Sequence, residues 1–201
     1  MFNTIQDIRD ALQFQFNTKV SPPVYHYEEL SPCGRYRLTI DEFAVKENQT
    51  ISEFVVATVL LREANEVVTT FLRNDSRLFY AWITRNDHDY LLFPEDLEGQ
   101  SIVDLTTRRI AGFADKEGGF IWTEFHPSPD KAKLAVIGCF WACPYQVVVY
   151  DFRDPMDVPF KVMAEIDLPG NNAQFGQWTS NESFTMIDRQ GVSHVFQVPK
   201  E

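Results

Sequence analysis

The chain has 201 residues, of which 44% are hydrophobic and 14% are aromatic. Disordered segments are poor in aromatic residues, so this composition excludes a disordered chain, and the length allows one domain with a sizeable core. Acidic residues outnumber basic residues by 29 to 18, which gives a formal net charge of −11. Nucleic-acid backbones recruit clustered Lys and Arg, so we expect neither nucleic acid nor an anionic membrane as a partner.

The first 20 residues lack the continuous apolar run of a secretory signal, and no segment reaches the ~18 apolar residues of a membrane span. The three cysteines are an odd number at sparse spacing, which does not indicate a disulfide framework. We therefore expect a cytoplasmic protein without a cofactor or a bound metal.

The first predicted element is a short helix that begins at Thr4, with Asp7 three residues on as in a capping box, and ends near Ala11. Apolar and polar residues then alternate from Leu12 to Phe16, which favours a strand. Such a strand would pair with the end of the chain and close a ring of sheets. A longer amphipathic helix is the alternative for this segment.

One phrase recurs farther along the chain. Residues 31–40 (SPCGRYRLTI) align with residues 128–137 (SPDKAKLAVI), and weaker copies lie at 74–83 and 178–187. The repeats therefore begin near 31, 74, 128 and 178. Spacings of this size are typical of the sheets of a β-propeller, which repeat every ~40–50 residues.

The third repeat has the clearest strand pattern. Its β-branched and aromatic runs lie at 120–125, 134–137, 146–152 and 160–166, with turn-forming residues between them. The last repeat has runs at 175–178, 183–188 and 194–198 and lacks a fourth strand. We predict an all-β fold in which residues 1–201 form one domain. Its four antiparallel meander repeats would build a small or incomplete propeller-like ring.

The third repeat contains the turn Ser128-Pro129-Asp130, a Leu-Ala-rich strand, and a strand that ends Tyr150-Asp151. In these features it resembles a blade of the WD-repeat-type β-propellers, whose repeats often end Trp-Asp. The resemblance covers about 47 residues well and the other repeats loosely. It implies a scaffold that binds other macromolecules.

The most unusual local sequence runs from Cys139 to Pro144, at the tip of a predicted hairpin, and includes Phe140, Trp141 and Cys143. Zinc sites generally leave two residues between paired cysteines, whereas this segment leaves three, and the cytosol disfavours a disulfide. Buried structural cysteines are therefore the simplest interpretation, with a redox pair and a metal site as the alternatives. If the loop is exposed, Trp141 is suited to anchor a partner.

The second candidate is Asp87-His88-Asp89, within the predicted loop from Arg85 to Tyr90. Two flanking carboxylates would stabilise a protonated imidazole, so His88 could serve as a base or a metal ligand. An ordinary polar turn explains the same residues, because Asn and Asp side chains bond to nearby backbone.

Three functional hypotheses follow. The first is a protein-interaction scaffold that uses both candidate loops, with another protein or a second copy of the chain as its partner. The second is a hydrolase or metal-assisted enzyme centred on Asp87, His88 and Asp89. The third is an acidic decoy that occupies a nucleic-acid-binding protein, since the chain is strongly acidic.

Overall fold

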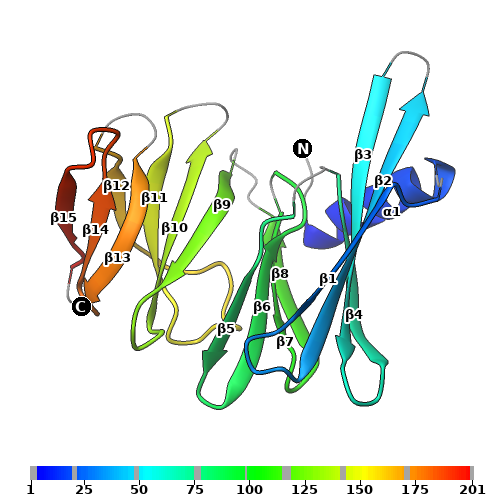
Figure 1. The fold of residues 1–201 in the computed structure, drawn as a ribbon, viewed down its shortest axis with the longest axis horizontal. Helices are drawn as coiled ribbons and strands as arrows, with labels where there is room; N and C mark the ends of the chain where they lie inside the picture. Colours follow the sequence, from blue (N-terminus) through cyan, green and yellow to red (C-terminus); the bar gives the residue numbers. More distant parts are fainter. Residues whose placement is uncertain are drawn as a thin grey trace.

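The computed structural model describes residues 4–19, 22–47, 50–74, 78–97, 99–114, 119–140, 144–169 and 173–199. In these residues, one helix precedes four antiparallel sheets, which stand side by side in the order of the chain (Figure 1). The first and last sheets lie at opposite ends of the row. The all-β prediction and the propeller-like repeat of sheets are therefore confirmed, with an incomplete ring.

Each of the first three sheets is a four-stranded meander, and the fourth sheet has three strands within the described residues. Sheet 1 contains β1 (Tyr25–Leu30), β2 (Tyr36–Glu47), β3 (Thr50–Leu61) and β4 (Glu66–Arg73). Sheet 2 contains β5 (Ala81–Arg85), β6 (His88–Pro94), β7 (Gly99–Asp104) and β8 (Arg109–Ala114). Sheet 3 contains β9 (Phe120–Pro127), β10 (Lys133–Phe140), β11 (Gln146–Asp151) and β12 (Val162–Asp167). Sheet 4 contains β13 (Gln174–Ser180), β14 (Ser183–Ile187) and β15 (Ser193–Gln197).

The recurring phrase has a structural cause. In sheets 1 and 3 it forms the first hairpin turn, where the Ser hydroxyl accepts a hydrogen bond from the backbone N–H five residues on. Tyr36 donates to Ser31 at 3.1 Å, and Lys133 donates to Ser128 at 3.0 Å. The third residue after the Ser has a positive φ in both turns, 71° at Gly34 and 58° at Lys131. The two copies of the phrase therefore encode one turn geometry.

The prediction of a repeat beginning near 74 is wrong. Residues 66–73 form β4, the outer strand of sheet 1, and sheet 2 begins at Ala81. The matching hairpin of sheet 2 turns at Asn86 and Asp87, with φ of 50° and 62°. Positive φ at both central residues makes this a two-residue type I′ turn, which needs no Ser-Pro phrase. The weak copy of the phrase at 74–83 therefore lies before the hairpin of sheet 2 and does not form it.

The N-terminal segment is helical throughout α1 (Ile5–Lys19), so the predicted strand from Leu12 to Phe16 is wrong. The predicted cap at Thr4 is confirmed, because its hydroxyl accepts from the backbone N–H of Asp7 at 3.1 Å. Ile8 and Leu12 are buried and α1 contacts β4, β7 and β8. This packing outweighs the local alternation in deciding the conformation, and it leaves the helix on the outer strands of sheets 1 and 2.

The core lies between neighbouring sheets, in three apolar layers. Sheets 2 and 3 are covered on both faces, so β7 is buried along its whole length and β10 along most of it. Sheets 1 and 4 each pack on one neighbour only. Within the described residues, the row of sheets therefore ends in two faces that no other sheet covers.

Polar contacts join the first hairpins of successive sheets. Arg35 of sheet 1 pairs with Asp89 of sheet 2 at 2.5 Å. Arg85 of sheet 2 donates to the carbonyl of Asp130 in sheet 3 at 2.8 Å, and the N–H of Asp130 donates to Asn181 of sheet 4 at 3.1 Å. These contacts hold one end of all four sheets together, and the second candidate site lies among them.

Candidate functional site

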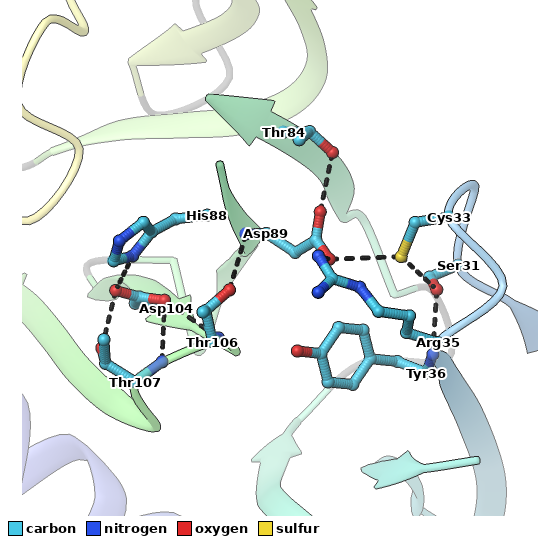
Figure 2. Close-up of polar contacts among 10 residues, drawn as sticks. All are labelled: Ser31, Cys33, Arg35, Tyr36, Thr84, His88, Asp89, Asp104, Thr106 and Thr107. Atoms are coloured by element: carbon cyan, nitrogen blue, oxygen red, sulfur yellow. Dashed lines mark hydrogen bonds and ion pairs between the residues drawn. The ribbon is translucent and has the colours of Figure 1, made fainter. Parts of the chain in front are cut away.

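The segment Asp87-His88-Asp89 divides between a turn and a strand. Asp87 lies in the exposed type I′ turn, and β6 begins at His88. Neighbouring residues on a strand point to opposite faces, so His88 and Asp89 face different neighbours. Figure 2 shows the two sets of contacts side by side.

His88 bonds to Asp104 at the end of β7. Its Nδ1 lies 2.7 Å from Asp104 Oδ2, which also accepts from the hydroxyl of Thr107 at 2.6 Å (Figure 2). The other oxygen, Oδ1, accepts from the backbone N–H groups of Thr106 and Thr107 at 3.0 and 3.1 Å. Asp104 is buried and closes the turn between β7 and β8. Burial opposes ionisation, but the hydrogen bonds from Thr107 and His88 prevail and lower the pKa of Asp104 below its usual value.

Asp89 faces sheet 1 instead. Its Oδ2 lies 2.5 Å from Arg35 Nη2 and 3.2 Å from the Cys33 thiol, and its Oδ1 accepts from the Thr84 hydroxyl at 2.8 Å (Figure 2). Asp89 is only 4% exposed, and its backbone N–H donates to the Thr106 hydroxyl at 3.1 Å. This carboxylate therefore fastens the first hairpin of sheet 1 to sheet 2.

The three residues of the predicted enzyme centre therefore do not converge on one point. The pair of His88 and Asp104 has the geometry by which a carboxylate orients an imidazole in a catalytic base. Among the described residues, however, no hydroxyl or thiol bonds to His88 Nε2, where a nucleophile would sit. Nor do any three or more His, Cys, Asp or Glu residues in that part of the chain form a group able to hold a metal ion.

The lowered pKa of Asp104 predicts how stability depends on pH. A carboxyl group with a lower pKa in the folded state stabilises the fold above its unfolded pKa of ~3.9 and loses this contribution as the pH falls through the folded pKa. The variant Asp104→Asn should therefore lower the free energy of unfolding by about 1–2 kcal/mol near neutral pH. Urea unfolding should show this difference shrinking below about pH 4.

Asp87→Asn, in the exposed turn, serves as the control and should change the free energy of unfolding by less than about 0.5 kcal/mol. A difference between wild type and Asp104→Asn that stays constant down to about pH 2 would show that the carboxylate of Asp104 is not preferentially stabilised by the fold.

The other sequence candidate lies at the second hairpin of sheet 3. Cys139 is buried in β10 as a free thiol, which agrees with the structural interpretation. Phe140 is partly exposed and packs on Phe120, with ring centroids 5.1 Å apart. Trp141 and Cys143 lie outside the described residues. The end of β10 and the β5–β6 turn lie at opposite ends of the strands, so Phe140 and His88 are not brought together (Figure 1).

One surface was not found from the sequence. Strand β1 is exposed on both faces, with Tyr25 53% and Tyr27 40% exposed on one face and Leu30 50% exposed on the other. The sequence of β1 lacks a clear alternation of apolar and polar residues, because Tyr, His and Glu fill the segment. β1 is held by its pairing with β2 and by Glu29, which accepts from the Trp82 indole at 2.6 Å.

No protein-family model matches the chain. An uncharacterized protein of Acanthamoeba polyphaga mimivirus is 27% identical over 130 residues, which cover 64% of this chain. The chain spans about half the length of that relative, 51%. The described part of the chain contains no helix with the length and apolar character that a membrane span requires.

Two solved structures are similar. Dihydro-heme d1 dehydrogenase NirN, in complex with DHE, matches with a TM-score of 0.51 and 13% identity, over 86% of this chain and 35% of that one. The N-terminal domain of Nup159 matches with a TM-score of 0.35 and 14% identity, over 85% of this chain and 54% of that one. The likeness to NirN concerns the fold, and it agrees with the propeller-like repeat of sheets.

Proposed function

We propose that the protein is a protein-interaction module of propeller-like fold, and that β1 is its main contact with a partner. The observation that carries this proposal is the exposure of β1 on both faces at a free edge of sheet 1. A strand with an unpaired edge and exposed apolar residues is a template for association with another chain.

The residues of β1 suit this role. Tyr is enriched at binding hot spots, and Tyr25 and Tyr27 lie two positions apart on one face of the strand. Val24, just before the strand, is 65% exposed and extends the apolar surface. We name Val24, Tyr25, Tyr27 and Leu30 the β1 strip.

Charge favours a basic partner. The net charge is −11, and Glu28 lies exposed in β1 next to Tyr27. Such a field attracts positively charged surfaces and speeds their association. The free thiols of Cys33 and Cys139 suit a reducing compartment such as the cytoplasm.

The test is the double variant Tyr25→Ser with Leu30→Ser. Both side chains are about half exposed, so the melting temperature should change by only a few degrees. Loss of these two apolar anchors should lower the affinity for a partner captured by the wild-type protein by about thirtyfold or more. Titration of the purified partner measures this affinity.

The matched control is Val195→Ser in β15, which is 63% exposed at the other end of the row of sheets. Equal losses in the control and the double variant would refute a specific role for β1. Light scattering on the purified protein tests whether the partner is a second copy of the chain. Dimerisation of the wild type that the double variant abolishes would show that it is.

The hydrolase centred on Asp87, His88 and Asp89 is a weaker proposal, because these side chains bond to different neighbours. The acidic decoy rests on net charge alone. Neither has an observation comparable to the exposure of β1.

A further inference from the structure

A cleft of about 320 Å³ lies at the opposite edge of sheet 1 from the β1 strip, between helix α1 and strand β4. Its volume is at the small end of ligand-binding clefts, which run from about 300 to 1,000 Å³. Residues of α1, β3, β4, β8 and the end of β6 line it, and most of them are apolar. No part of the function proposed above uses this cleft.

Four consecutive residues of β4, from Thr69 to Leu72, line the cleft. Alternate side chains of a strand point to opposite faces, so a cleft that meets four in a row opens onto the edge of the strand. β4 is the outer strand of sheet 1 and pairs only with β3. Among the described residues, no backbone hydrogen bond joins Thr69–Leu72 to any segment other than β3. The cleft therefore presents an unpaired strand edge.

The other walls of the cleft are mainly apolar, and their polar lining residues are Arg9, Gln13 and Glu95. Leu12 and Phe16 face it from the helix, and Ile110 faces it from β8 with 47% of its surface exposed. The helix is held at this position by Arg9, whose guanidinium lies 2.6 Å from the buried carboxylate of Glu95. A helix often covers a sheet edge to block strand pairing, but this helix leaves room beside the edge.

We propose that this cleft binds an extended peptide segment of a partner protein. The segment adds to β4 as a fifth strand and inserts an apolar side chain between α1 and Ile110. Strand addition supplies affinity through backbone hydrogen bonds, and a pocket for alternate side chains supplies specificity. Asp7 and Asp10 are exposed on α1, and the chain is acidic overall, so the segment carries basic residues beside its apolar anchor.

The test begins by selecting short random peptides, displayed on phage, against the intact protein. A synthetic peptide of the enriched consensus is then titrated by fluorescence anisotropy. Ile110→Lys places a charge in the apolar wall and should weaken binding by about tenfold or more. Thr70→Lys, at an exposed position on β4, should weaken it similarly. Val67→Lys is the matched control on the same strand, because Val67 is 52% exposed and does not line the cleft.

Hydrogen exchange with the same peptide tests strand addition itself. The amides of β4 that face away from β3 should exchange more slowly when the peptide is bound. The proposal is overturned if no peptide is enriched, if Ile110→Lys binds as the wild type does, or if β4 gains no protection. The double variant Tyr25→Ser with Leu30→Ser should bind this peptide as the wild type does. Failure of the β1 proposal and failure of the cleft proposal can therefore be told apart.

Discussion

Replacing Trp122 with Ala is expected to lower the free energy of unfolding by about 3–5 kcal/mol, the cost typical of removing a buried aromatic side chain. Trp122 is 1% exposed and lies in the apolar layer between sheets 2 and 3. Its ring contacts Phe125, Tyr150 and Phe160, with centroids 5.5–6.1 Å away. Domains are typically stable by about 5–15 kcal/mol, so this single change should bring the protein close to unfolding at ordinary temperature.

Urea unfolding measures this loss, and Trp122→Phe is the matched variant because it keeps an aromatic ring in the layer. The Phe variant should lose clearly less than the Ala variant. A loss below about 1 kcal/mol for Trp122→Ala would show that sheets 2 and 3 do not pack through this residue.

The second large effect is expected for Asp89→Ala, which should lower the free energy of unfolding by about 2–3 kcal/mol. The change removes the acceptor shared by Arg35, Cys33 and Thr84 and separates the first hairpin of sheet 1 from sheet 2. Arg35 is half exposed and regains water, so the cost stays below that of stranding a fully buried charge.

Comparing the free energies of unfolding of Asp89→Ala and Asp87→Asn tests whether Asp89 alone links the sheets. An enzyme centred on Asp87, His88 and Asp89 would give both carboxylates a role in activity, whereas the contacts give only Asp89 a role in folding. Urea unfolding should therefore show a loss for Asp89→Ala that exceeds the loss for Asp87→Asn several-fold. Equal losses would contradict the assignment of Asp89 as the link between the sheets.

The repeat architecture was predictable because turn chemistry is local. Ser31 and Ser128 form the same turn through the same hydrogen bond, so their surroundings recur in the sequence. The hairpin of sheet 2 turns instead at Asn86 and Asp87 in a type I′ turn, which does not use the phrase. A repeat is therefore visible in sequence only where the turn type is kept.

The N-terminal segment shows the opposite case. Alternation from Leu12 to Phe16 fits a strand, while Ile5, Ile8 and Leu12 fit one face of a helix. The choice depends on the outer strands of sheets 1 and 2, against which Ile8 and Leu12 are buried. Those strands lie far along the chain, so local pattern alone could not decide it.

The candidate site was only partly predictable. Sequence adjacency suggested that His88 and Asp89 act together, but strand geometry turns them to opposite faces. Asp89 meets Arg35, which is 54 residues away, and only the packing of sheet 1 on sheet 2 reveals this pair. The exposure of β1 was equally hidden, because Tyr and His occupy buried and exposed positions alike.

Hydrogen exchange of β1 tests the role of this strand most directly, first in the purified protein and then with its captured partner. In the isolated protein, the amides of β1 that face away from β2 should exchange rapidly, because β1 is an edge strand of sheet 1. They should become protected in the complex. Slow exchange of these amides in the isolated monomer, or no added protection in the complex, would contradict the proposal that β1 is an open binding edge.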